Sequence, residues 1–276
     1  MSFEKQDYAS FRRIVWHYGK IQGRNNLPWR KTRNPYRVLV SEVMLQQTQV
    51  SRVVPLYRTF LKKFPSLRAL ARAELAEVLT AWQGLGYNRR AKMLLEAAQI
   101  LVAERHGGVV PRDPSLLETL PGIGRYSARA VSVFAFNEEY VFVETNVRTA
   151  VLHHFFPRRR VVQDKEIEAL LLCMLPKNRA REWYGALMDY GAYLKRRGVH
   201  LNKQSAHYHT QKSFTGSPRQ ARGALLRALT DGLPHRASTL TALLGAPRRA
   251  QMRAALAALL AEGLIEKKGM YYFLPN

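Results

Sequence analysis

The sequence predicts a mainly α-helical protein that ends in a small α+β domain. Apolar residues recur at helical spacing along most of residues 1–217. The remainder, residues 218–276, changes pattern and finishes in two short β-like segments around a Lys-Lys-Gly turn. We therefore expect two domains with a boundary at residue 218.

Start and stop signals divide the first domain into helices. Asn34 is a candidate N-cap, and Pro35 suits the first helical position. The stretch at 197–220 lacks periodicity and contains Gly, Ser and Pro, so it predicts an irregular segment. We expect helices at 5–22, from 35, from 50, and at 74–83, 88–105, 113–120, 125–136, 163–174 and 179–196.

The charge of the chain indicates its partner class. It carries 44 Lys and Arg against 20 Asp and Glu, a net charge of +24. A positive field of this size attracts polyanions, so nucleic acid is the expected partner, ahead of an anionic membrane. No apolar run approaches the roughly 20 residues that span a bilayer, and the N-terminal residues do not resemble a signal peptide. We expect an intracellular, cytoplasmic and nucleoid-associated protein that makes no membrane contact.

The second domain has the element order of a winged helix. Three helices are expected within 221–232, 236–245 and 247–264, followed by a hairpin at 265–276. In that arrangement the third helix faces a DNA groove, and we expect DNA contacts from Arg248, Arg249 and Arg253. The alternative is a packing or dimerisation module whose arginines are solvated.

The segment LPGIGRYSARAV, residues 120–131, places a proline and two glycines between two helical stretches. Glycine permits a positive φ, so the turn can direct backbone N–H groups and a helix N-terminus at a phosphate. We expect Gly122 and Gly124 to bind a DNA phosphate, and the turn is also a candidate site for a monovalent cation. An ordinary tight turn with a C-cap glycine is the alternative.

Four motifs follow one another along the chain: SEVMLQQTQV at 41–50, WQGLGYNRRA at 82–91, LPGIGRYSARA at 120–130 and VETNVRTAV at 143–151. Together they resemble the helix-hairpin-helix-GPD superfamily of DNA base-excision glycosylases. The first motif is most similar to the MutY-type adenine DNA glycosylases. The resemblance covers about residues 10–195 and implies two helical subdomains that bind double-stranded DNA and flip a nucleotide out of it.

The resemblance implies different tasks for two acidic residues. Glu42 lies in an apolar setting, which raises a carboxyl pKa, and it matches the family's acid that protonates the leaving base. Glu144 stands where the family usually has aspartate, and an ionised carboxylate there stabilises the cationic sugar. The alternative for Glu144 is a helix cap. Asn146 matches the motif asparagine and is expected to orient the water or the acid.

Tyr126 bears on the type of reaction. Bifunctional relatives have a lysine at this position and form a Schiff base with the sugar. Because tyrosine cannot form one, the resemblance implies a monofunctional glycosylase without a lyase step. The alternative for Tyr126 is aromatic packing.

Further matches concern the DNA itself. Gln47 matches a residue that wedges into the base stack, and Tyr87 matches an intercalating aromatic, for which core packing is the alternative. Basic residues near the motifs are expected to act as general phosphate contacts: Arg89, Arg90, Arg125 and Arg129.

The sequence departs from the MutY-type pattern in two features. MutY-type enzymes commonly carry a four-cysteine iron–sulfur cluster, whereas this sequence has one cysteine, so we expect no metal and no cofactor. The β-rich domain that helps those enzymes detect 8-oxoguanine is also replaced by the winged-helix candidate. The expected function is a monomeric, monofunctional DNA N-glycosylase that removes adenine from mispairs with 8-oxoguanine or guanine. The alternatives are a glycosylase for mismatched thymine, uracil or another deaminated base, and a catalytically altered, structure-specific DNA-binding protein.

Overall fold

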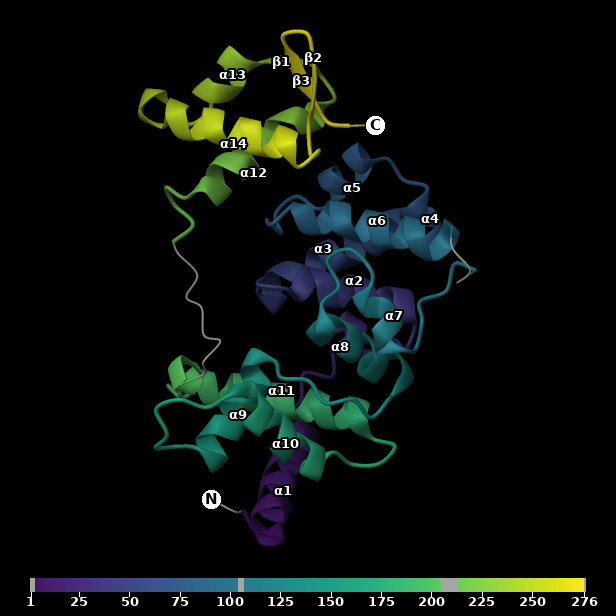
Figure 1. The fold of residues 1–276 in the computed structure, drawn as a ribbon, viewed down its shortest axis with the longest axis vertical. Helices are drawn as coiled ribbons and strands as arrows, with labels where there is room; N and C mark the ends of the chain where they lie inside the picture. Colours follow the sequence, from purple (N-terminus) through teal and green to yellow (C-terminus); the bar gives the residue numbers. More distant parts are fainter. Residues whose placement is uncertain (1–2, 104–106, 205–212, 276) are drawn as a thin grey trace. The chain divides into compact units, whose positions relative to one another are not determined.

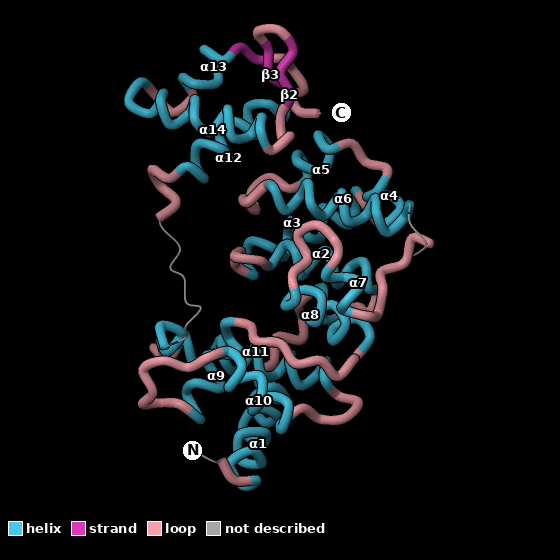
Figure 2. The backbone as a smooth tube through the Cα atoms, in the orientation of Figure 1, coloured by secondary structure: helices cyan, strands magenta, loops and turns pink. Residues whose placement is uncertain are grey.

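The computed structural model describes residues 3–103, 107–204 and 213–275. Helices dominate the described chain, and strands occur only in its C-terminal part (Figures 1 and 2). The predicted fold class, mainly α with a small C-terminal α+β domain, is therefore confirmed. The chain divides into two compact units. The first comprises Met1–Leu39, Arg112–Glu118 and Ile123–Thr210, and the second comprises Val40–Pro111, Thr119–Gly122 and Gln211–Asn276.

The first unit is built around α11, the last of its α-helices. This helix packs against α1 and α9, and its Trp183 and Tyr184 are fully buried among apolar side chains from α1, α9 and α10. The elements of this unit are α1 (Lys5–Gln22), η1 (Pro28–Arg30), α7 (Pro114–Glu118), α8 (Arg125–Phe136), α9 (Thr145–Phe155), α10 (Asp164–Met174), α11 (Ala180–Arg196) and η2 (Leu201–Gln204).

A buried carboxylate on α11 fixes the loop that follows α1. Asp189 is 2% exposed and accepts hydrogen bonds from the backbone N–H of Arg24 at 2.8 Å and from its Nε at 2.5 Å. Arg30 adds a bidentate pair, with Nη1 at 2.5 Å and Nη2 at 2.9 Å from the two carboxylate oxygens. The two arginines compensate the buried charge, which would be costly without partners.

The second unit contains a helical part in which α6 packs against α4 and α5. Its helices are α3 (Val50–Lys63), α4 (Leu67–Ala71), α5 (Leu75–Ala81) and α6 (Arg89–Ala103). Helix α2 (Pro35–Leu45) begins in the first unit and continues into the second. Its start has the predicted cap, because the side chain of Asn34 accepts a hydrogen bond from the N–H of Arg37 at 3.1 Å.

The C-terminal part has the element order predicted for a winged helix. It runs α12 (Pro218–Ala228), η3 (Leu229–Asp231), β1 (His235–Arg236), α13 (Ala237–Ala242), η4 (Ala246–Arg248), α14 (Arg249–Ala261), β2 (Glu266–Lys268) and β3 (Tyr271–Phe273). The sheet has the antiparallel order β1-β3-β2, with Tyr272 paired to His235 on one side and Lys267 on the other. Strand β1 was not expected from the sequence.

Polar contacts join this part to the helices of the same unit. The carbonyl of Pro275 accepts from the N–H of Ala76 at 3.0 Å. Gln83 donates to the hydroxyl of Thr230 at 2.8 Å, and the ammonium group of Lys92 donates to the carbonyl of Glu262 at 2.8 Å. The compact units are not continuous in sequence, so the predicted domain boundary at residue 218 stays a prediction.

Candidate functional site

Glu42 lies on α2 and is only 5% exposed. Its neighbours along the helix include Val38, Val43 and Met44, which are all buried. Among the described residues the other buried acidic side chain is Asp189, which two arginines neutralise. Burial disfavours the charged form of a carboxyl group. Glu42 is thus a buried acidic residue on α2, and its expected role as an acid stays a prediction.

Gln47 and Tyr87 occupy two tight turns of the second unit. Gln47 lies between α2 and α3 with φ of 53°, and Tyr87 lies between α5 and α6 with φ of 48°. Such values are uncommon for residues other than glycine and mark positions that the surrounding structure holds in place. The side chain of Gln47 is exposed. Arg219 of α12 donates to the hydroxyl of Tyr87 at 3.1 Å.

The hairpin turn uses its two glycines differently. Gly122 has φ of +75°, and a Cβ there would lie 2.9 Å from the Cβ of Met93. Gly124 is extended and is the N-cap of α8, and a Cβ there would meet nothing within 4 Å. The first N–H groups of a helix have no intrahelical acceptor, so the start of α8 beside this turn is a candidate position for an anion.

Two side chains of α8 contact the loop that precedes α9. The ring of Tyr126 is half-buried and meets Phe142 edge-on at 5.5 Å, and Phe142 stacks on Tyr184 at 3.9 Å. Arg129 donates to the carbonyl of Val141 at 2.8 Å. Both contacts fix the path of the chain toward Glu144.

Glu144 is the N-cap of α9. Its Oε2 accepts from the backbone N–H of Asn146 at 2.6 Å, and its Oε1 accepts from the Asn146 side-chain amide at 3.2 Å and from the Thr145 hydroxyl at 2.5 Å. The carboxylate is half-buried. The structure thus brings Glu144 and Asn146 together and shows the capping contact that the sequence offered as an alternative. A cap does not preclude chemistry at the same carboxylate.

The first turn of α9 is pressed against α11. A Cβ at Gly191 would lie 1.9 Å from the carbonyl oxygen of Asn146, so only glycine allows this approach. On the other side, the Asn202 amide donates to the carbonyl of Thr145 at 3.3 Å and accepts from the hydroxyl of Thr149 at 3.1 Å. These contacts set where Glu144 lies in the first unit.

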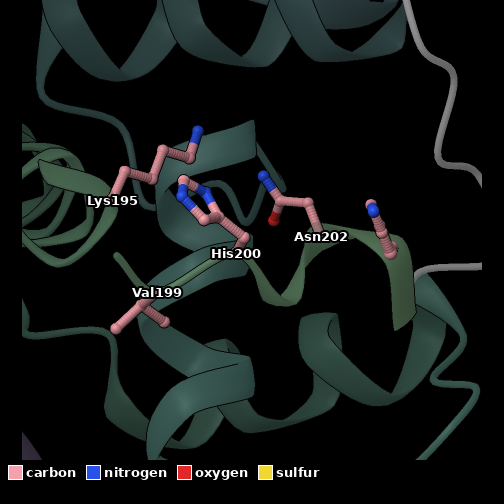
Figure 3. Close-up of a pocket in the computed structure, with 5 residues that line it drawn as sticks. Lys195, Val199, His200 and Asn202 are labelled. Atoms are coloured by element: carbon pink, nitrogen blue, oxygen red, sulfur yellow. The ribbon is translucent and has the colours of Figure 1, made fainter. Parts of the chain in front are cut away.

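A pocket of about 300 Å³ lies beside this turn. It is lined by Lys195, Val199, His200, Asn202 and Lys203. Figure 3 shows the polar ends of Lys195, His200 and Asn202 directed to the same region, whereas Val199 points away from it. Burial lowers the pKa of the Lys195 ammonium group; the nearby charge of Glu144 opposes this shift, and Arg148 adds to it. Sequence reasoning missed Lys195 and Asn202, because the hydrogen bonds of Asn202 and the interaction of Lys195 with Glu144 join segments about 50 residues apart.

The arginines predicted to contact DNA differ in their exposure to solvent. Arg89, Arg125, Arg249 and Arg253 are exposed, although Arg125 also forms an ion pair with Glu168 at 3.2 Å. Arg248 instead donates to Gln220 at 2.7 Å and to Gln251 at 2.6 Å within the C-terminal part.

Arg90 differs most from the expectation of a phosphate contact. Its side chain is buried, 9% exposed, and its terminal nitrogens donate to backbone carbonyls. A guanidinium group in that position faces the interior of the second unit.

No metal centre is built by the described residues: within 3–103, 107–204 and 213–275, no group of three or more His, Cys, Asp or Glu side chains could hold a metal ion. Cys173 is exposed, and one cysteine does not fit a four-cysteine iron–sulfur cluster. In the same part of the chain, no helix is both long and apolar enough to cross a membrane.

Comparison with known proteins decides the family. Residues 40–177 match the HhH-GPD superfamily of base excision DNA repair proteins. Over 265 residues the chain is 39% identical to an adenine DNA glycosylase of Mycolicibacterium smegmatis, which covers 88% of this chain and 89% of that protein. This chain belongs to the HhH-GPD superfamily. The resemblance drawn from the four sequence motifs is confirmed.

Other known proteins and solved structures are also similar to this chain. An adenine DNA glycosylase of Mycobacterium tuberculosis is 37% identical over 239 residues, covering 78% of this chain and 76% of that protein. A trapped endonuclease III–DNA covalent intermediate has a TM-score of 0.60 at 23% identity and covers 70% of this chain and 88% of its own. A thermostable thymine-DNA glycosylase has a TM-score of 0.58 at 24% identity, covering 74% and 97%. At these identities the structural likeness establishes the fold alone.

The close approach of α9 and α11 is testable by a pair of variants. Gly191→Ala would place a methyl group 1.9 Å from the carbonyl oxygen of Asn146, so the first turn of α9 must move. We expect a loss of about 1–3 kcal/mol in the free energy of unfolding and faster amide exchange at Asn146. Gly185→Ala in the same helix is the matched control, because its Cβ would lie 3.7 Å from the nearest atom. Equal stability of the two variants would contradict the packing argument.

Proposed function

We propose that this protein is a monofunctional adenine DNA glycosylase of base excision repair. The observation that carries the proposal is the 39% identity to an adenine DNA glycosylase along 88% of this chain. A buried carboxyl group at Glu42, inside the first motif, supports it chemically. The substrate we propose is adenine mispaired with 8-oxoguanine or guanine in double-stranded DNA.

Glu42 is the acid in the proposed reaction. Adenine is a poor leaving anion, so cleavage of its N-glycosidic bond is helped by protonation of the base. Burial of Glu42 favours a carboxyl group that holds a proton to donate. When the bond to C1′ breaks, its electron pair stays with the protonated adenine, which leaves as the neutral base.

Glu144 and Asn146 act on the sugar. Loss of the base leaves a cationic, oxocarbenium-like C1′, which a nearby carboxylate stabilises. Glu144 is held by three donors from Thr145 and Asn146, and this support favours one fixed position for its charge. Water then bonds to C1′ and gives its proton to a carboxylate of the site. Tyr126 has no amine, so we infer that hydrolysis is not followed by a lyase step.

The DNA contacts follow the same assignment. We propose that Gly122, Gly124 and the start of α8 bind a DNA phosphate. The same turn is a candidate site for a monovalent cation. Gln47 and Tyr87 enter the base stack beside the flipped nucleotide. The exposed arginines contact phosphates. We further propose a monomer that works inside the cell on the nucleoid and requires no iron–sulfur cluster.

A panel of duplexes tests the function directly. Single-turnover excision would be measured on adenine opposite 8-oxoguanine, adenine opposite guanine, thymine opposite guanine, uracil opposite guanine, and hypoxanthine. We expect the two adenine duplexes to react fastest. Preference for thymine or uracil would replace adenine as the substrate, and binding without any excision would favour the altered DNA-binding protein.

Glu42→Gln should remove excision but not binding. The substitution keeps the shape of the side chain and removes the carboxyl proton, so the single-turnover rate should fall by roughly 10²–10⁴-fold. Duplex affinity should stay close to that of the wild type. Glu182→Gln is the control, since Glu182 forms an exposed ion pair with Arg179 at 2.6 Å and its loss should leave the rate unchanged. A fully active Glu42→Gln protein would refute the assignment.

The absence of an amine at Tyr126 predicts the product. Strand breaks should appear only after hot alkali, and borohydride should trap no covalent protein–DNA complex, with a lyase-active glycosylase as positive control. Efficient trapping would contradict the monofunctional assignment. Lys195→Arg would then test one candidate amine, because Lys195 interacts electrostatically with Glu144 and burial lowers its pKa.

The proposed DNA face of α14 predicts a salt dependence. Arg249→Gln or Arg253→Gln should each reduce the slope of log affinity against log salt by about 0.9, the value for one phosphate contact. Arg227→Gln removes the same charge from the exposed surface of α12 and should change the slope less. Slopes for Arg249→Gln and Arg253→Gln that equal the wild-type slope would indicate that α14 presents no DNA-binding face.

A further inference from the structure

The buried side chain of Arg90 connects three segments of the second unit: the end of α2, the turn after it and the turn before α6. Its Nη1 donates to the carbonyls of Val43 at 2.8 Å and Met44 at 3.1 Å, in the last turn of α2. The same nitrogen donates to the carbonyl of Gln46 at 2.5 Å. A positive charge at the C-terminal end of a helix is also stabilised by the partial negative charge of the helix dipole there. The guanidinium group therefore holds the place where α2 ends and the next turn begins.

The other terminal nitrogen reaches the neighbouring turns. Its Nη2 donates to the Thr48 hydroxyl at 3.1 Å, to the Gly86 carbonyl at 3.1 Å and to the Leu85 carbonyl at 3.4 Å. The backbone N–H of Arg90 donates to the carbonyl of Tyr87 at 2.9 Å, and its guanidinium lies 5.5 Å from the centre of the Tyr87 ring. One side chain thus contacts residues around both Gln47 and Tyr87.

These two turns need external support. Gln47 and Tyr87 both have left-handed backbone conformations, which cost of order 1 kcal/mol or more for residues other than glycine. The guanidinium group of Arg90 bonds to Gln46 and Thr48, which flank Gln47, and to Gly86, which precedes Tyr87. Its hydrogen bonds hold both conformations at once.

The burial of Arg90 argues for position and against a direct phosphate contact. Burial lowers its pKa to about 10, and a nearby Tyr87 opposes the shift. Its Nε is buried without a hydrogen-bond partner among the described residues. A buried charge is a costly way to stabilise a fold, whereas a planar fork of donors is suited to fixing several carbonyls in one arrangement.

We propose that Arg90 is a positioning residue that sets the Gln47 and Tyr87 turns together, so that both side chains are presented to DNA in one fixed relation. This inference rests on the proposed function for the role of Gln47 and Tyr87 in the base stack. It also makes the two turns interdependent, because loss of one guanidinium group releases both.

Amide exchange of the free protein tests the first part. Arg90→Lys keeps the charge but replaces a fork of two nitrogens by one, so it cannot reach both turns. We expect amides at 46–48 and 85–88 to exchange at least about tenfold faster, with α9 and α11 unchanged. Arg89→Lys is the adjacent control, because Arg89 is exposed and its replacement should leave exchange at both turns unchanged. Unchanged exchange in Arg90→Lys would overturn the proposal.

DNA binding and excision test the second part. In Arg90→Lys, single-turnover excision at saturating enzyme should fall at least about tenfold, because this readout follows positioning in the bound state. Affinity for an undamaged duplex and its salt slope should stay near the wild-type values. A slope that falls by about 0.9 would instead make Arg90 a phosphate contact and overturn the proposal.

A milder variant covers the case in which Arg90→Lys does not fold. Thr48→Val removes one acceptor of Nη2 and the hydroxyl that donates to the carbonyl of Gln46, so exchange should rise at 46–48 and not at 85–88. Equal exchange at both turns would contradict the contact network. These exchange measurements need no substrate, so a wild-type protein that fails to excise adenine would refute the proposed function without deciding the role of Arg90.

Discussion

The first turn of α9 depends on a contact that only glycine permits. Gly191 of α11 leaves room for the carbonyl oxygen of Asn146, which a Cβ would meet at 1.9 Å. Asn202 holds the same turn from another side through the carbonyl of Thr145. Because α11 also carries the buried Asp189 that fixes the loop after α1, one helix orders both that loop and the start of α9. The position of Glu144 follows from this packing.

Glu144 carries two tasks in this account. As N-cap it satisfies the backbone N–H of Asn146, and as a carboxylate it provides negative charge for the proposed sugar cation. Glutamate reaches one bond farther than the aspartate usual in the family, and here its two oxygens are engaged by Thr145 and Asn146. A longer acid with this support is compatible with a defined site. Lys195 adds a positive charge near Glu144, and it lies outside the four sequence motifs.

Local patterns predicted most of the fold. The helices at 5–22 and 125–136 have the predicted bounds, and the cap at Asn34 is observed, because periodicity and capping are properties of neighbouring residues. Strand β1 was missed since its two residues pair with Tyr271 and Tyr272 far along the chain. The burial of Arg90 was missed for a related reason. Its carbonyl partners at Val43, Met44 and Gln46 are more than 40 residues away.

Two abasic-site analogues test directly whether the fixed carboxylate of Glu144 stabilises a cationic sugar. Affinity would be measured for duplexes that carry a cationic pyrrolidine or a neutral tetrahydrofuran at the target position opposite 8-oxoguanine. We expect the pyrrolidine duplex to bind at least about tenfold more tightly and Glu144→Gln to lose this preference. Equal affinity for the two duplexes, or a preference that survives in Glu144→Gln, would contradict this role of Glu144.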